Sequence, residues 1–181
     1  ASKFYRAPHF PEARTFRRFV VLFPAYKEDR VIVSSARSFL EQDYPQELFD
    51  VIIISDQMQF ATNDTLRSLP ICLLIADYKE SSKAKALTMA IDSIEGEPYD
   101  IVVIMDADNL TSPDFLAEVN RAFDNGVKSV QAHRTGKNLN TDISVLDGIS
   151  EEINNGIFRS GHNALGLSAA LSGSGMAFEA E

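Results

Sequence analysis

The sequence predicts a doubly wound α/β fold, with a mostly parallel sheet and helices on both of its faces. Two observations support this prediction. Short continuous apolar runs, typical of strands buried on both faces, recur between residues 19 and 105. Segments with apolar residues at helical spacing separate these runs. Strands that alternate with helices of this length form parallel sheets joined by right-handed crossovers.

The individual elements follow from these patterns. The expected strands are residues 19–23, 51–54, 71–75, 101–105 and 127–132. The expected helices cover residues 28–42 and 62–69, a stretch that ends near Gly96, and a segment that opens at Ser112-Pro113-Asp114. Pro24 is expected to end the first strand. The third helix should bury Leu87, Ile91 and Ile94. Beyond Thr135 glycines interrupt the pattern, and we expect a helix around 143–159 and a strand near 169–171.

The length and composition fit one globular domain. The chain has 181 residues, of which 45% are hydrophobic and 24% charged. Residues 1–18 are basic and irregular and are expected to form a lead-in segment. The net charge of -9 argues against a nucleic-acid partner, because binding a long polyanion requires a basic surface. A small phosphate ligand remains compatible with this charge if a divalent cation offsets it locally.

The single cysteine and the apolar runs indicate the compartment. Cys72 lies within an apolar run and is interpreted as a core residue in a reducing compartment. No apolar stretch approaches the ~20 residues that span a bilayer, and no signal-peptide core is present. We therefore expect a soluble, cytoplasmic fragment of a longer protein. Any association with the cytoplasmic face of the inner membrane is expected to come from segments outside these residues.

Polar side chains follow four of the predicted strands. They are Pro24 to Glu28, Ser55-Asp56, Asp77 with Lys83 and Lys85, and Asp106-Ala107-Asp108. Ligands of open parallel sheets bind outside the carboxyl ends of the strands. If the strands are neighbours, these four groups meet at one rim.

Asp106 and Asp108 are the strongest candidates for a metal site. Two carboxylates one residue apart at the end of a strand can share Mg²⁺ or Mn²⁺, which would bridge a diphosphate. The alternative is a polar turn that leads into a helix, a common place for Asp and Asn. Asp56 could accept hydrogen bonds from a ligand or be a turn acid, and Lys83 could bind phosphate or belong to a solvated helix face.

Five ordered motifs resemble the family 2 glycosyltransferases of GT-A fold, particularly the membrane-associated polysaccharide synthases. The motifs are Phe23-Pro24-Ala25-Tyr26-Lys27-Glu28, Ile54-Ser55-Asp56, Lys83-Ala84-Lys85-Ala86-Leu87, Met105-Asp106-Ala107-Asp108-Asn109 and Gly173-Ser174-Gly175-Met176. The resemblance implies a Rossmann-like GT-A nucleotide-sugar-binding domain over residues 19–181, truncated at its C-terminal side. It also implies a nucleotide-diphosphate sugar donor, usually a UDP-sugar, a saccharide or lipid-linked acceptor, and a divalent cation, Mg²⁺ or Mn²⁺.

The resemblance also assigns roles to single residues. Pro24, Ala25, Tyr26 and Glu28 would line the nucleoside pocket, Asp56 would bind the base and Lys83 the nucleotide. Asp106 would contact the ribose or the metal, and Asp108 would ligate the metal. The turn formed by Gly173, Ser174 and Gly175 would border the sugar and the acceptor. The general base would lie beyond Glu181, in an acidic motif downstream of this turn.

Three positions depart from the family pattern. Lys27 stands where the family usually has Asn, Gln57 where it usually has Gly, and Thr88 where it usually has Asn. Two other functions are weighed against a glycosyltransferase. A sugar nucleotidylyltransferase would need a Gly-rich loop with Arg and Lys directly after the first strand, which is absent from the sequence. A non-catalytic nucleotide-binding or regulatory α/β domain is the other alternative.

Overall fold

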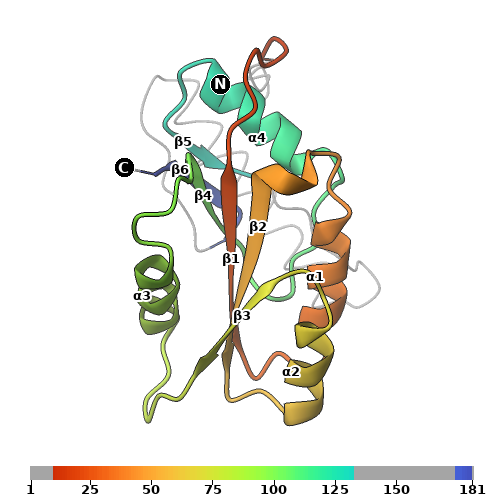
Figure 1. The fold of residues 1–181 in the computed structure, drawn as a ribbon, viewed down its shortest axis with the longest axis vertical. Helices are drawn as coiled ribbons and strands as arrows, with labels where there is room; N and C mark the ends of the chain where they lie inside the picture. Colours follow the sequence, from red (N-terminus) through yellow and green to blue (C-terminus); the bar gives the residue numbers. More distant parts are fainter. Residues whose placement is uncertain (1–9, 133–173, 181) are drawn as a thin grey trace, which may run out of the picture.

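The computed structural model describes residues 10–132 and 174–180, which form a six-stranded sheet with helices on both faces (Figure 1). The strands are β1 (Phe19–Tyr26), β2 (Phe49–Asp56), β3 (Cys72–Ala76), β4 (Ile101–Ile104), β5 (Ser129–Gln131) and β6 (Met176–Glu179). The helices are α1 (Ile32–Leu40), the 3-10 helix η2 (Gln46–Leu48), α2 (Phe60–Arg67), α3 (Lys83–Ser93) and α4 (Phe115–Asp124).

The sheet is mostly parallel, as the sequence predicts. Its strand order is β3-β2-β1-β4-β6-β5, and β1 pairs in parallel with both β2 and β4. β2 pairs in parallel with β3, so the carboxyl ends of four neighbouring strands lie at one edge. β6 is antiparallel to both β4 and β5 and lies between them. The sequence patterns predict no strand at β6, which begins at Met176, the last residue of the glycine-turn motif.

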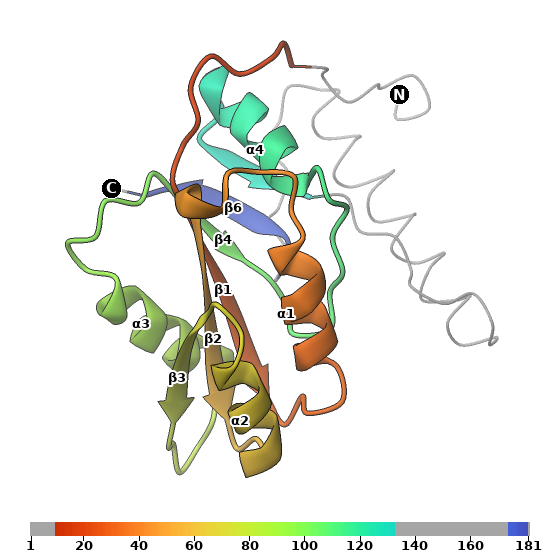
Figure 2. The same ribbon diagram turned by 45° about the vertical axis from the view of Figure 1, so that its right-hand side comes forward.

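Alternate residues of β1 divide the core into two layers. Phe19, Val21 and Phe23 face the larger cluster, to which α1, α2 and α4 contribute apolar side chains. Val20 and Leu22 face the smaller cluster, which α3 covers. Figure 2 shows α3 on the other side of the sheet from α1 and α2. This alternation is the period-2 geometry of a strand buried on both faces, and it confirms helices on both sides of the sheet.

The expected end of the first strand is wrong. Pro24 lies inside β1, which continues to Tyr26 in register with Asp56 of β2. The pairing of β1 with β4 stops at Leu22 and Ile104, so Pro24 lies where β1 has one ladder partner instead of two. Proline lacks an N–H and is tolerated in a strand where one side carries no ladder bond.

The interpretation of Cys72 as a core residue is also wrong. Cys72 is exposed because β3 forms the edge of the sheet, where one side of the strand has no neighbour among the described residues. β3 begins one residue later than the predicted strand. An apolar run at an edge strand is not protected as it would be at the centre of the sheet.

The buried face of α3 differs from the prediction. Ala86 and Ala90 are the buried residues of α3, whereas Ile91 is 51% exposed. Leu87 and Ile94 are partly buried at the margin of the smaller cluster. The small side chains of the two alanines allow the helix to approach β1 and β2 closely, so the buried stripe is centred on alanine and not on the larger aliphatic residues.

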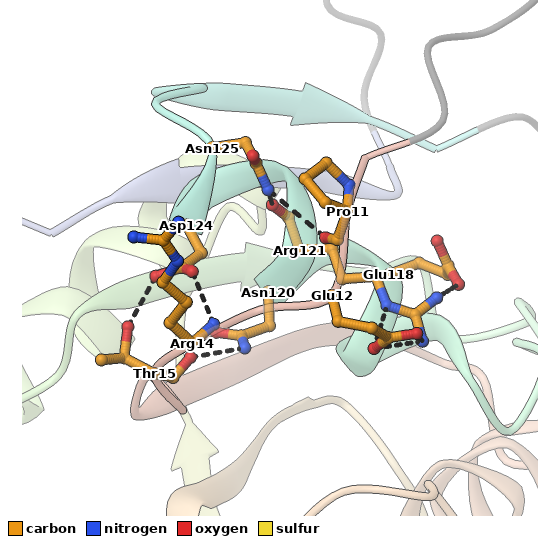
Figure 3. A network of polar contacts seen from close by, with 9 residues as sticks. All are labelled: Pro11, Glu12, Arg14, Thr15, Glu118, Asn120, Arg121, Asp124 and Asn125. Carbon is orange, nitrogen blue, oxygen red and sulfur yellow. Dashed lines mark hydrogen bonds and ion pairs between the residues drawn. The ribbon is translucent and has the colours of Figure 1, made fainter.

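The described part of the lead-in segment, residues 10–18, has no helix or strand but is anchored to α4 (Figure 3). Asp124 accepts hydrogen bonds from the backbone N–H of Arg14 at 2.7 Å and from the hydroxyl of Thr15 at 2.6 Å. Arg121 forms an ion pair with Glu12 at 3.0 Å. The amide of Asn120, a residue that is only 1% exposed, donates to the carbonyl oxygen of Thr15 at 2.9 Å. These contacts fix the path of the chain into β1.

Several predictions fall on residues that the structure does not describe. They are the helix around 143–159, the strand near 169–171, and Gly173. Among residues 10–132 and 174–180, no helix has the length and apolar character needed to cross a membrane.

Candidate functional site

The carboxyl ends of β1, β2 and β4 surround a cavity of about 510 Å³, together with the first turn of α3. The residues that line it are Pro24, Ala25, Tyr26, Glu28, Asp56, Ser81, Ser82, Lys83, Ala86, Asp106, Ala107 and Asp108. All eight residues that the sequence pointed to as nucleotide-sugar ligands are in this set. Parallel pairing of neighbouring strands brings them together, although up to 84 residues separate them in the chain.

Two residues that the sequence placed at the same rim, Asp77 and Lys85, lie outside the cavity lining. The ammonium group of Lys85 donates to the carbonyl oxygen of Glu80 at 2.7 Å and lies 5.8 Å from the ring centroid of Tyr78. Neither Lys85 nor Asp77 lines the cavity. Lys83 and Lys85 are two residues apart on a helix, a separation that points their side chains in different directions.

Sequence reasoning missed Ser81 and Ser82, which line the cavity just before α3. Ser82 is the N-cap of α3, and its side chain accepts a hydrogen bond from the backbone N–H of Lys85 at 3.2 Å. A serine before the first helical residue is a recognisable cap signal and could have placed this loop. The N-terminus of α3 therefore faces the cavity, with the positive end of its dipole available to an anion.

Asp56 is the most buried polar residue of the cavity lining. It is 2% exposed, and its Oδ1 atom has no hydrogen-bond partner within the described part of the chain. Leaving a buried carboxylate oxygen unpaired is costly, so such an atom calls for an explanation. Because a carboxylate is an acceptor only, a ligand that satisfies Asp56 must supply an N–H or O–H group.

Lys83 and Asp106 form an ion pair across the cavity. The Lys83 Nζ atom lies 2.5 Å from Asp106 Oδ1, and the two side chains are 40% and 34% exposed. Lys83 is the first residue of α3, where a cation opposes the helix dipole, so the carboxylate of Asp106 offsets that unfavourable position. The pair brings the one lysine of the lining and a predicted metal ligand into direct contact.

Ser174 supports the loop that carries the two aspartates. Its side-chain oxygen accepts hydrogen bonds from the backbone N–H of Asp106 at 2.7 Å and from the amide of Asn109. Ser174 is fully buried, and its carbonyl oxygen accepts from the amide of Gln131 at 2.7 Å. The glycine turn is therefore adjacent to the Asp-x-Asp loop, in a supporting position that sequence reasoning did not foresee.

Gly175 explains why this turn needs glycine. Its φ angle is +67°, and an added Cβ atom would lie 3.2 Å from the Cβ of Ala132. Its N–H donates to the carbonyl oxygen of Ile104 at 2.8 Å, one residue before Met105. A left-handed conformation and a close neighbour both favour glycine here.

Asp106 and Asp108 fit a metal that is shared with a ligand. No group of three or more His, Cys, Asp or Glu side chains suited to a cation occurs in residues 10–132 and 174–180. Two carboxylates are hard oxygen ligands, and Mg²⁺ typically binds one or two of them while substrate phosphates complete its shell. Asp106 and Asn109 also form a backbone turn, from Asn109 N to Asp106 O at 3.1 Å, so the polar-turn interpretation and the metal interpretation are compatible.

Asp29 fixes the loop that follows β1. Its Oδ1 atom accepts hydrogen bonds from the Thr62 hydroxyl at 2.6 Å and from the Gln59 N–H at 2.8 Å. These bonds, the Thr62 bond most strongly, hold the pKa of Asp29 below the usual 3.8. Asp29 thereby joins the segment after β1 to the beginning of α2.

The whole chain from residue 17 onward matches a known family. The family model is described as "Glycosyltransferase like family 2", and it covers residues 17–181. The chain belongs to this family. The match agrees with the resemblance carried by the five sequence motifs and favours a glycosyltransferase over a nucleotidylyltransferase.

Solved glycosyltransferase structures share the fold. The mannosyltransferase PcManGT from Pyrobaculum calidifontis, in complex with GDP-Man and Mn²⁺, has a TM-score of 0.69 and 23% identity over 98% of this chain. S. aureus TarS has a TM-score of 0.60 and 19% identity over 68% of the chain. Glucosyl-3-phosphoglycerate synthase from Mycobacterium tuberculosis, with Mn²⁺, UDP and glucosyl-3-phosphoglycerate, has a TM-score of 0.57 and 19% identity over 90%. None of the curated proteins compared gives a match.

These likenesses establish the GT-A fold of this chain. The chain spans 50%, 23% and 57% of the length of PcManGT, TarS and the synthase, respectively. The nucleotides, sugars and Mn²⁺ in those structures are ligands of those proteins.

Proposed function

We propose that this chain is the donor-binding part of an inverting glycosyltransferase that uses a nucleoside-diphosphate sugar, with UDP as the favoured nucleotide. The observation that carries the proposal is that all eight residues predicted to bind the nucleotide sugar line one cavity. The full-length protein would transfer the sugar to a saccharide or lipid-linked acceptor. We propose that it works in the cytoplasm or at the cytoplasmic face of the inner membrane, by way of segments outside these residues.

The residues of the cavity divide into a nucleoside side and a phosphate side. Pro24, Ala25, Tyr26 and Glu28 would line the nucleoside side, and Asp56 would accept an N–H of the base. On the phosphate side, Lys83 and the N-terminus of α3 supply positive charge for the diphosphate. The net charge of -9 does not prevent this, because the attraction is local.

Asp106 and Asp108 would hold Mg²⁺ or Mn²⁺ together with the donor's phosphates. When bound, such a cation would offset the negative charge that develops on the departing nucleoside diphosphate. Ser174 keeps the two carboxylates in place by bonding to the backbone of Asp106. Lys83 would exchange its contact with Asp106 for one with the phosphates.

The sugar and the acceptor would lie beside the turn at Gly173, Ser174 and Gly175. The acceptor hydroxyl must lose a proton as it attacks the anomeric carbon. We place the base for this proton beyond Glu181, in the acidic motif that the family carries downstream of the glycine turn. Residues 1–181 alone would then bind the donor but transfer the sugar poorly.

The proposal is tested by ligand-dependent melting. The melting temperature is recorded with UDP, with Mn²⁺ and with both, for the wild type, for Asp108→Asn and for Asp64→Asn. Asp64 is an exposed carboxylate on α2, outside the cavity, and is the matched control. A ligand at a hundred times its Kd stabilises a protein by about 2.7 kcal/mol, which for a domain of this size raises Tm by roughly 5 to 10 °C.

We expect UDP with Mn²⁺ to stabilise the wild type and Asp64→Asn equally, and Asp108→Asn much less. No shift for the wild type would overturn the proposal. An equal shift for Asp108→Asn would remove Asp108 from the binding site.

A further inference from the structure

Two residues that directly follow cavity-lining residues, Tyr26 and Asp56, have an unusual backbone. Lys27 and Gln57 have φ angles of 55° and 53° and follow β1 and β2 directly. The two residues are neighbours, and the N–H of Lys27 donates to the carbonyl oxygen of Asp56 at 3.1 Å. Residues other than glycine adopt this left-handed conformation rarely, and where they do the surroundings must hold them there.

The side chains of Lys27 and Gln57 both contact Tyr26. The hydroxyl of Tyr26 donates to Gln57 Oε1 at 3.5 Å, and the Lys27 Nζ atom lies 5.0 Å from the centroid of the Tyr26 ring. Gln57 Nε2 donates in the other direction to the hydroxyl of Ser81 at 3.3 Å. Tyr26 and Ser81 both line the cavity, so the carboxamide of Gln57, which is not itself part of the lining, links β1 to the loop before α3.

These two hydrogen bonds are weak enough to be exchanged for bonds to a ligand. Bonds between oxygen atoms in proteins are usually 2.5–3.0 Å long, and those with nitrogen donors 2.7–3.2 Å. The contacts of Gln57 exceed these ranges. Gln57 is exposed and is free to turn its NH2 group towards a bound molecule without breaking a strong internal bond.

Asp56 and Gln57 together present an acceptor beside a donor. Asp56 is a buried carboxylate whose Oδ1 atom lacks a partner among the described residues, and the next residue, Gln57, carries an NH2 group that donates to the cavity-lining Ser81. The complementary group is a lactam, a ring N–H next to a carbonyl oxygen. Uracil and guanine have such an edge. Neutral cytosine and adenine instead have a ring nitrogen with a lone pair next to an amino group. The lone pair would face the carboxylate of Asp56, which is also an acceptor. The amino group would face the NH2 group of Gln57, which is also a donor.

Resting on the proposed function, we propose that Gln57 is a base-specificity residue that donates to a carbonyl oxygen of the donor nucleotide while Asp56 accepts the neighbouring ring N–H. The site therefore takes uridine or guanosine diphosphate sugars and rejects those of cytidine and adenosine. The strained backbone at residue 57 is retained because the side chain has this use.

The test measures the Kd of UDP, GDP, CDP and ADP in the presence of Mn²⁺ by calorimetry. The variants are Gln57→Glu, which replaces the NH2 donor by an acceptor, and Gln57→Gly, which removes the side chain and suits the left-handed backbone. Gln59→Glu is the control, since it introduces the same charge two residues away, at an exposed position. Melting temperatures are recorded for all proteins.

We expect the wild type to prefer UDP or GDP over CDP and ADP by at least tenfold. Gln57→Glu should weaken the preferred nucleotide about tenfold or more, because it leaves a carbonyl facing a carboxylate. Gln57→Gly should bind it several-fold more weakly and yet melt at a higher temperature, a combination that a purely structural role would not produce. Gln59→Glu should bind within about twofold of the wild type.

Two results would overturn the inference, and they are distinguishable. If the wild type binds a nucleotide but both Gln57 variants bind all four as the wild type does, Gln57 does not read the base, and the proposed function stands. If the wild type binds none of the four nucleotides, the proposed function fails and the inference fails with it.

Discussion

The ammonium nitrogen of Lys83 lies 2.5 Å from a carboxylate oxygen of Asp106, inside the cavity that we assign to the donor. The same carboxylate is proposed to bind the divalent cation, and the same ammonium group is proposed to bind the diphosphate. In the absence of a donor each group thus neutralises the other. A cation arriving alone must compete with Lys83 for Asp106, whereas a donor that draws Lys83 to its phosphates frees the carboxylate.

Lys83→Gln is therefore expected to change metal and nucleotide binding in opposite directions. An ion pair as exposed as this one contributes at most about 1 kcal/mol, so Mn²⁺ alone should bind about two- to fivefold more tightly to the variant. UDP in the presence of Mn²⁺ should bind about tenfold more weakly, because a charged contact to phosphate is lost. Calorimetric titrations measure both. Lys85→Gln, on the same helix but outside the cavity, should alter neither, and a Lys83→Gln protein that matches it would refute the competition.

Ser174→Ala is expected to destabilise the fold and weaken Mn²⁺-dependent UDP binding. The substitution leaves the N–H of Asp106 and the amide of Asn109 without their acceptor, at a cost of about 1–3 kcal/mol. Ser35→Ala is the matched control, because the Ser35 hydroxyl is buried without a partner among the described residues. Urea unfolding should show no loss for Ser35→Ala. Equal losses in the two variants would mean that the bonds to Ser174 do not matter.

Lys27→Asn is expected to stabilise the domain by about 0.5–1 kcal/mol. A left-handed conformation costs most L-residues roughly 1–2 kcal/mol, and asparagine tolerates it better. Urea unfolding with an unchanged m value would establish the gain. The same exchange at Lys79, where φ is not positive, should give none. A destabilised Lys27→Asn protein would indicate that the contact of Lys27 with the Tyr26 ring outweighs the strain.

Asp29 is expected to contribute stability that disappears in acid. Its pKa is below 3.8 in the folded protein, because it accepts hydrogen bonds from Thr62 and Gln59. The unfolded chain therefore binds more protons in this range, so the contribution is complete above about pH 4–5 and falls as pH drops through the folded pKa. Asp29→Asn should melt below the wild type at pH 7, and the difference should shrink towards pH 3. A difference of constant size for Asp29→Asn across this pH range would contradict the argument.

The sequence was sufficient for the central strands and for most of the cavity. A run such as that of β2 is apolar at successive positions because helices cover both faces of the inner strands, and its composition shows this directly. The motif residues Asp56, Asp106 and Asp108 could be placed because parallel strands present their carboxyl ends at one edge. Local sequence patterns were enough to predict burial and position wherever these depend only on the strand or helix to which the residue belongs.

The remaining features depend on partners that are distant in the chain. β6 is a strand because β4 and β5 pair with it, and Met176–Glu179 is too short for its pattern to reveal this. Cys72 is exposed because of the place of β3 in the sheet order, which its apolar run does not encode. Lys27 and Gln57 depart from the family motif, and only the structure shows that both have a left-handed backbone.

The position of β6 also bears on how the domain is made. The bond between Asp106 and Ser174 spans 68 residues, whereas β1 to β4 are complete at Ile104. At a synthesis rate of about 5–20 residues per second, Ser174 emerges from the ribosome about 3 to 14 seconds after Asp106. A nascent chain therefore has β1, β2 and β4 before it has the residue that supports the loop of Asp106 and Asp108, which we propose binds the metal. Until then, both that loop and the unpaired side of β4 are open to chaperones.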